Sequence, residues 1–362
     1  MNISNPDLPY WLAVARVSNF GAIKIAKLFR AFQYMERAFC ASREELLNAQ
    51  IDLSSTNRFI NERSQISPAD ELFRLQSEKT FLITLADEEY PSLLKQIYDP
   101  PAVLFIRGTL PDKNRKHIAI VGTRHPTRYG IQSTNTIVEP LANSGAVIVS
   151  GLAYGIDATA HKATLKQNGI TVAVLGSGVD QTSIYPSGNR NLASEIISNG
   201  GAIISEFPIG TSPFKSHFPL RNRVIAGLCQ TTIIIEAAQK SGSLITARAA
   251  LEDGREVYAV PGPIDSLLSE GPNNLLKMGA APVTCAADIM EVKEVRSTVF
   301  SYEPRNETER QLLAKISHEP IHVDELMMQA NLAIDVTNST ITLLEIKGVV
   351  RHVGGRYYIR IA

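Results

Sequence analysis

The sequence predicts an α/β protein in which a doubly wound parallel sheet follows a helical domain and precedes a winged helix. Six short apolar runs, rich in β-branched residues, alternate with helix-like segments between residues 118 and 260. These runs are apolar throughout rather than at every second position, which is typical of parallel strands buried on both faces. Helical spacing of apolar residues before residue 80, and a helix-then-hairpin pattern after residue 306, predict the two flanking domains.

Composition and charge set the broad class of the protein. The 362 residues include 36 Lys and Arg against 36 Asp and Glu, so only a local patch could bind a polyanion. The spacing of Cys40, Cys229 and Cys285 fits neither a metal site nor a disulfide framework, and we expect reduced, buried thiols. Residues 1–21 do not resemble a signal peptide, and no apolar stretch reaches the about 18 residues that span a bilayer. We therefore expect a cytoplasmic protein with no membrane contact.

Residues 1–80 are expected to form a small helical bundle. Ser42 and Glu45 have the spacing of a capping box, and Ser67 followed by Pro68 is a typical helix start. The segment "VSNFGAIKIAKL" also suggests a helix–hairpin–helix, a motif that grips the DNA backbone. Simple helical packing and direct DNA contact both stay open for this domain.

Residues 81–117 are predicted to connect this bundle to the sheet. Two adjacent prolines at 100 and 101 end any helix, and the following "AVLFI" is typical of a strand. The main domain then spans residues 118–295. Its expected strands are 118–121, 146–150, 171–175, 202–205, 232–236 and 256–260. Ligands of such sheets bind beyond the carboxyl ends of the strands, so those ends are the place to search for a site.

The turn after the first strand, "GTRHPTRYG", begins like a phosphate-binding turn but departs from the dinucleotide fingerprint. Gly122 follows the strand, whereas positions 124 and 127, which should be glycine, are Arg124 and Thr127. Arginine at 124 prevents the close backbone approach that a pyrophosphate needs and presents a cation instead. Arg128 adds a second cation, and the turn contains no acid.

Further strand ends carry anion-binding features. After the second strand, Gly151 and Gly155 loosen the backbone, and Asp157 could cap the next helix. The turn after the third strand begins G-x-G, but glutamine at position 181 departs from the dinucleotide fingerprint here too. Residues 206–227 are expected to form a long irregular loop that carries Lys215 and several other cations and aromatics. Ser241, Gly242 and Ser243 open a helix after the fifth strand, which predicts backbone N–H groups facing an anion.

These loops share one edge of the sheet, and their cations lack local acidic partners, although Glu206 and Glu236 could serve as structural partners. No P-loop sequence and no carboxylate cluster for magnesium is present. Cations beside aromatic rings suit single-stranded nucleic acid, whose backbone follows the charges while its bases stack. The residues alone therefore predict a site for single-stranded nucleic acid or for a nucleotide.

Several long motifs, in order, resemble those of the DNA processing protein A family (DprA, also called Smf). They are "IAIVGTRHPTRYG", "VIVSGLAYGIDATAH", "SEFPIG", "FPLRNRVIAGL" and "EAAQKSGSLITARAALEDGREVYAVPG". The resemblance covers about residues 118–290, and the flanks resemble the family's sterile-alpha-motif-like and winged-helix domains by pattern. It implies an extended Rossmann-like sheet and a cytoplasmic, non-enzymatic protein. Such a protein would dimerise, bind single-stranded DNA without sequence preference and help load the RecA recombinase during natural transformation.

The resemblance also implies which residues hold DNA. Arg124 belongs to the family's G-[ST]-R turn, Lys215 and Phe218 to the loop after the fourth strand, and Arg221 to an R-N-R motif. No catalytic residue, metal or cofactor is expected. The predicted DNA-binding residues are Gly122, Thr123, Arg124, Arg128, Ser150, Gly151, Lys215, Phe218, Arg221, Asn222, Arg223, Ser241, Gly242 and Ser243.

Residues 306–362 are expected to form a separate winged helix with Gly354 and Gly355 at the turn of its hairpin. DNA contact and partner or dimer contact are both open for this domain. Two other functions remain as alternatives. One is a nucleotide phosphoribohydrolase, whose catalytic glutamate motif is not matched here, since the corresponding turn has Ala247. The other is a nucleotide-binding sensor that uses the same pocket.

Overall fold

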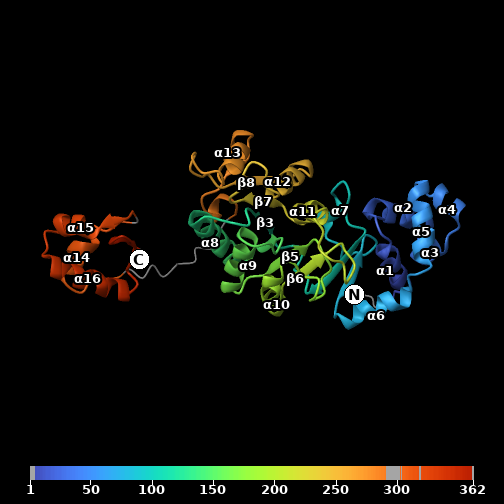
Figure 1. Ribbon diagram of the computed structural model, residues 1–362, viewed down its shortest axis with the longest axis horizontal. Helices are drawn as coiled ribbons and strands as arrows, with labels where there is room; N and C mark the ends of the chain where they lie inside the picture. The colour runs from blue at the N-terminus through green and yellow to red at the C-terminus, as the bar shows by residue number, and fades with distance from the viewer. Residues whose placement is uncertain (1–4, 291–301, 303, 318, 361–362) are drawn as a thin grey trace. The chain divides into compact units, whose positions relative to one another are not determined.

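The computed structural model describes residues 5–290, 302, 304–317 and 319–360. The chain divides into two compact units, Met1–Lys293 and Glu294–Ala362, which are described separately (Figure 1). In the described residues, no helix is long and apolar enough to cross a membrane. Of the three cysteines, Cys229 is buried, whereas Cys40 and Cys285 are exposed, so the expectation that all three thiols are buried is wrong for two of them.

The first unit begins with a helical bundle built around Trp11, Leu28 and Phe59, all almost fully buried. Ser42 and Glu45 form the expected reciprocal capping box, and the Ser67 side chain caps the helix that starts at Pro68. Both predicted helix starts are therefore confirmed. The helices are α1 (Leu8–Arg16), α2 (Ala22–Phe32), α3 (Met35–Cys40), α4 (Arg43–Asn48), α5 (Leu53–Arg63) and α6 (Pro68–Ser77).

A nine-stranded sheet follows, with the strand order β1-β2-β6-β5-β4-β3-β7-β8-β9. All neighbours from β6 to β9 are parallel, as predicted, whereas β2 pairs antiparallel with β6, and β1 antiparallel with β2. The connector thus extends the sheet by a hairpin, of which β1 was not expected. The strands are β1 (Phe81–Thr84), β2 (Val103–Gly108), β3 (His117–Val121), β4 (Val147–Ser150), β5 (Thr171–Leu175), β6 (Ala202–Ser205), β7 (Thr231–Ile234), β8 (Glu256–Ala259) and β9 (Ala281–Pro282).

Helices cover both faces of the sheet because successive strand residues point to opposite sides. Ile118 and Ile120 of β3 pack with α8 (Arg128–Asn143) and α9 (Ile156–Lys166), and Ile203 of β6 packs with α10 (Arg190–Ser198). Ala119 and Val121 face the other way. That second face packs with α7 (Ser92–Lys95), α11 (His217–Gly227) and α12 (Ser243–Glu252). The unit is completed by α13 (Glu270–Lys277) and the 3-10 helices Ser187–Asn189 and Ala286–Asp288.

The strand order reverses direction between β3 and β7, which makes this the switch point of the sheet. From β3 the chain proceeds through β4, β5 and β6 to one side, and α11 then crosses to β7 on the other side. The turns after β3 and β7 therefore separate, and a crevice opens between them at the carboxyl edge.

The predicted loop over 206–227 is irregular only in its first half, because His217–Gly227 form α11. This helix is buried on more than one side: Asn222, Val224 and Ile225 are buried, and so is Arg221. A helix enclosed in this way has no continuous polar face, so the apolar periodicity that identifies surface helices is missing from its sequence.

The second unit is a small helical domain with a hairpin wing, as predicted. Its core includes Leu312, Leu326, Ile341 and Leu344. Gly354 adopts a φ of 100° at the hairpin turn, a conformation that favours glycine. Its elements are α14 (Glu307–Leu313), β10 (Ile321–His322), α15 (Val323–Ala330), α16 (Ile334–Ile346), β11 (Val350–Gly354) and β12 (Tyr357–Arg360), with strand order β10-β12-β11.

Candidate nucleic-acid interface

A cleft of about 410 Å³ occupies the switch point at the carboxyl edge of the sheet. Four segments line it: the turn after β3, the connection from β4 into α9, α11 and the turn between β7 and α12. The predicted site residues found in its wall are Gly122, Thr123, Arg124, Phe218, Arg221, Asn222, Ser241, Gly242 and Ser243. The structure thus gathers nine predicted residues, from three distant parts of the sequence, around one cavity.

The turn after β3 is clamped between its neighbours. A Cβ at Gly122 would lie 2.6 Å from a side-chain carbon of Ile156, so only glycine fits there. The Thr123 N–H donates to the Glu236 carbonyl at 2.7 Å, and the Thr123 carbonyl accepts from the Ile156 N–H at 3.1 Å. These bonds fix the backbone immediately before Arg124, whose side chain is exposed at the mouth of the cleft.

The Glu236 carboxylate supports the same turn instead of pairing with an arginine. It accepts hydrogen bonds from the backbone N–H of Thr127, at 2.9 Å, and from the Thr127 hydroxyl, at 2.5 Å. Glycine at 130 leaves room for it, because a Cβ there would lie 2.2 Å from a Glu236 carboxylate oxygen. The expectation that Glu236 pairs with an arginine is therefore wrong.

Phe218 provides an aromatic surface in the cleft. The guanidinium carbon of Arg124 lies 5.4 Å from its ring centroid, within the range of a cation–π contact. The Tyr185 ring lies 6.0 Å away, at 48° to the Phe218 ring. A smaller pocket that both rings line, together with Tyr154, continues the cleft toward the end of β4. The half-buried Phe218 ring thus joins the two cavities.

Arg221 lines the cleft, but its side chain makes hydrogen bonds to backbone carbonyls within the protein. Its Nη1 group donates to the carbonyl oxygens of Gly151 and, at 2.7 Å, of Val174. A Cβ at Gly151 would lie 2.0 Å from this nitrogen, which explains the glycine. The Arg221 charge favours ionised Asp157, but burial is stronger and raises the pKa of Asp157. The side chain of Asp157 accepts from the Ala153 N–H at 3.3 Å and does not cap α9, contrary to expectation.

Three other predicted site residues have structural partners that the sequence does not reveal. The fully buried Ser150 hydroxyl donates to the Ile120 carbonyl at 2.6 Å and is not available to a ligand. Arg223 pairs with Glu206 and, at 3.2 Å, with Asp99, and it borders a different cavity. The expectation that Arg223 is an unmatched cation is therefore wrong, whereas the DNA-binding roles of Ser150 and Arg223 stay predictions. The Asn222 side chain donates to the Gly242 carbonyl at 3.0 Å and supports the serine–glycine–serine turn.

That turn forms the start of α12. The Ser241 and Ser243 hydroxyls lie 2.8 Å apart, and Gly242 is exposed with open space where a Cβ would be. The N-terminus of a helix carries partial positive charge and attracts anions. Lys240 precedes the turn, is exposed and lines the cleft. It was missed in the sequence, although its position directly before the turn is the signal that could have identified it.

Besides Arg223, two predicted cations lie outside the lining of the cleft. Lys215 is exposed on the loop that leads into α11, and Arg128 is the exposed first residue of α8. Both face solvent from segments whose neighbouring residues do line the cleft. The structure brings neither into the cavity itself, so any contact they make would be with a ligand that extends beyond it.

A parallel sheet with a cleft at its switch point places the protein among Rossmann-like α/β proteins, with an arginine where the dinucleotide fingerprint has glycine. Residues 81–294 match the family model of DNA recombination-mediator protein A, and residues 298–356 match the DprA winged helix domain. The chain therefore belongs to the DNA processing protein A (DprA/Smf) family, as its motifs indicated.

Relatives and solved structures agree with this assignment. Protein Smf of Synechocystis is 32% identical and covers 99% of this chain and all of the relative. DprA of Bacillus subtilis is 46% identical over 60% of this chain and 73% of its own length. The X-ray structure of DprA from Streptococcus pneumoniae superposes with a TM-score of 0.67 at 33% identity, covering 82% of this chain and 98% of that one. A structure describing the single-stranded DNA binding mode of Helicobacter pylori DprA has a TM-score of 0.52 at 33% identity, over 58% and 93% of the two chains.

Proposed function

We propose that the protein binds single-stranded DNA without sequence specificity in the switch-point cleft. The observation that carries the proposal is the pairing of Arg124 with the half-buried Phe218 ring at the mouth of a cleft whose far wall is a helix N-terminus. A cation, an aromatic face and the positive end of a helix are what a single strand needs. The H. pylori relative, described as binding single-stranded DNA, supports the same ligand.

In this proposal each side of the cleft has a different task. Arg124 and Lys240 would neutralise phosphates, and the serine–glycine–serine turn would receive a phosphate oxygen at the start of α12. Phe218 and Tyr185 would stack bases. Stacking and phosphate contacts do not distinguish base edges, so we expect no sequence preference.

The proposal extends to partners through family membership. We infer that the protein acts as a homodimer and helps load the RecA recombinase onto single strands during natural transformation. The support for both partners is the DprA/Smf family itself. Sedimentation equilibrium should give a dimer mass, and the protein should shorten the lag of RecA filament growth on single-stranded DNA. An unchanged lag, at protein concentrations that saturate the strand, would remove the loading role and leave DNA binding intact.

The binding test is a fluorescence anisotropy titration of a labelled oligothymidine and of a duplex over a series of salt concentrations. Single strands should bind more tightly, and log K should fall against log salt with a slope of about −0.7 per phosphate neutralised. Arg124→Ala should weaken binding by about 1.5–3 kcal/mol, the worth of a hydrogen bond to a charged group. Lys95→Ala, an exposed lysine on α7, is the control. Equal affinity for the duplex, or no effect of Arg124→Ala, would contradict the proposal.

A further inference from the structure

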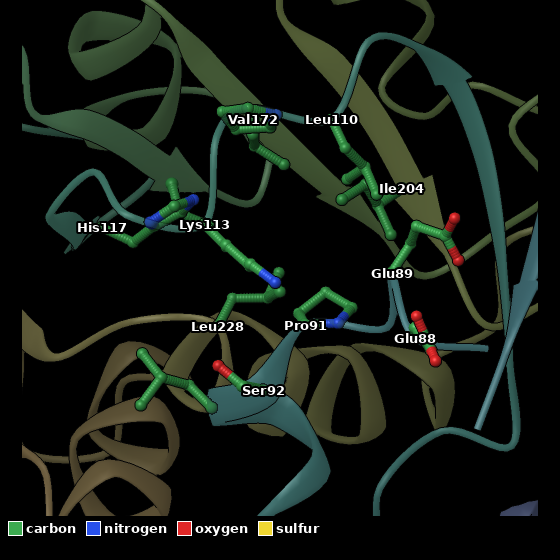
Figure 2. Close-up of a pocket in the computed structure, with 13 residues that line it drawn as sticks. Glu88, Glu89, Pro91, Ser92, Leu110, Lys113, His117, Val172, Ile204 and Leu228 are labelled. Atoms are coloured by element: carbon green, nitrogen blue, oxygen red, sulfur yellow. The ribbon is translucent and has the colours of Figure 1, made fainter. Parts of the chain in front are cut away.

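The same sheet has a second cavity, of about 380 Å³, on the face that carries α7 and α11 (Figure 2). It lies toward the amino edge, where the β2–β3 connection and the start of β3 form part of its wall. Its floor is aliphatic and comes from three neighbouring strands. The residues that form the floor and the apolar walls are Val149, Val172, Ile204, Leu110, Leu228 and Pro91.

The cavity has a topological cause. The crossovers from β3 to β6 place α8, α9 and α10 on the opposite face, because right-handed βαβ units turn the same way. On the cavity's own face, β4, β5 and β6 are covered by α11, the short α7 and connecting segments. These cover the strands incompletely, and aliphatic side chains of three strands reach the cavity wall.

The rim of the cavity is polar and predominantly acidic. Glu88 and Glu89 are both exposed on the segment between β1 and α7. Lys113 is the one ammonium in the lining, and its long stem extends across the cavity toward Pro91 (Figure 2). His117 also lines the cavity; burial lowers its pKa, and the contact of its Nδ1 with the Arg115 carbonyl at 2.8 Å opposes that shift.

We propose that this cavity docks a short peptide segment of a partner protein, in which a bulky apolar residue fills the cavity and an adjacent lysine or arginine pairs with Glu88 and Glu89. The aliphatic floor offers no polar group to orient a polar metabolite, whereas an apolar anchor in a pocket with a polar rim is typical of protein recognition. Charge complementarity selects a basic flank and excludes a nucleic acid, since two rim carboxylates repel phosphates.

The position of α11 also favours a positively charged group on the bound peptide. This helix begins at His217 and ends at Gly227, directly before Leu228 of the cavity wall. The C-terminus of a helix carries partial negative charge, which stabilises nearby cations. The inference concerns a surface separate from the DNA cleft and does not depend on the proposed function.

The test is selection of a displayed random heptapeptide library on the full chain. We expect enriched peptides to contain a bulky apolar residue beside lysine or arginine. A fluorescein-labelled copy of the most enriched peptide should bind Ser92→Trp, which fills the cavity from its exposed rim, at least tenfold more weakly than the unmodified protein. Lys95→Trp, an exposed position of the same helix outside the cavity lining, should bind it equally well.

Glu88→Lys combined with Glu89→Lys should weaken the peptide at least fivefold and reverse the salt dependence of its binding. Both residues are exposed, so this variant decides the question even if Ser92→Trp lowers the thermal unfolding midpoint. Enrichment of acidic peptides, equal binding to Ser92→Trp with an unchanged unfolding midpoint, or no enrichment at all would overturn the proposal. None of these measurements uses DNA, so their failure would leave the proposed function untouched.

Discussion

The two edges of the central sheet are built from the same strands but differ in chemistry. At the carboxyl edge, the cleft has Arg124, Lys240 and the first turn of α12 in its wall. Toward the amino edge, the second cavity has an aliphatic floor and two rim glutamates. In a βα repeat every helix begins near the carboxyl edge and ends near the amino edge, so the helix dipoles already give the two edges opposite sign. The loop residues add to this difference, and the two edges suit different ligands.

The largest effect should come from Arg221 and should be on the free energy of unfolding. This residue makes structural hydrogen bonds although it lines the cleft. Arg221→Ala leaves two buried carbonyls without their hydrogen-bond donor, and each unsatisfied buried group typically costs about 1–3 kcal/mol. Urea unfolding followed by fluorescence of Trp11, the only tryptophan, should show this loss. Arg128→Ala, at an exposed position, should change stability by no more than about 0.5 kcal/mol. Two similar unfolding curves would mean that Arg221 is a ligand residue and not a structural one.

Phe218 should give the next largest effect, on affinity and not on stability. Phe218→Leu keeps an apolar side chain but removes the flat ring, so single-strand affinity should fall by about 1–3 kcal/mol with the salt slope unchanged. Phe214→Leu is the matched control, because this ring is 59% exposed on the loop outside the cleft lining. If Phe218→Leu lowers the unfolding midpoint and leaves affinity intact, the ring is part of the core.

The two lysines test how far the strand extends along the carboxyl edge. Lys240→Ala should reduce the salt slope by about 0.7, since one phosphate loses its partner. Lys215→Ala should do the same if the strand continues over the loop before α11, as the family resemblance implies. The measurement is anisotropy at four or more salt concentrations, with Lys95→Ala as the control. An unchanged slope for Lys215→Ala would confine the strand to the cleft.

Much of this architecture follows from local sequence signals. The six apolar runs are strands because uninterrupted β-branched residues suit a sheet buried on both faces. The edge strand β1 was missed because its four residues, "FLIT", give no alternation long enough to recognise. The helix α11 was missed because tertiary contacts bury it on more than one side and leave no amphipathic period.

The site was predicted at the level of segments more accurately than at the level of side chains. Turn chemistry identified the turns after β3, β4 and β7, since glycines and serines mark close backbone approach, and cations beside aromatics identified the segment that forms α11. The partners of Arg221 lie 70 and 47 residues away, and those of Arg223 lie 124 and 17 residues away. A single sequence does not show such contacts, so arginines of one motif could not be sorted into those that face a ligand and those that hold the fold.

The smallest expected effect is that of changing the rim glutamates of the second cavity on the affinity for DNA at the carboxyl edge. Glu88→Lys combined with Glu89→Lys makes the rim of the second cavity basic, and neither residue lines the DNA cleft. The Debye length is about 8 Å at 0.15 M salt, so single-strand affinity should change less than about twofold there. At 0.01 M salt, where the Debye length is about 30 Å, the same variant should associate faster with DNA. A tenfold gain at 0.15 M salt would mean that DNA reaches the amino edge. In that case the acidic rim would act mainly to repel DNA, and the contrast between a nucleic-acid edge and a peptide edge would fail.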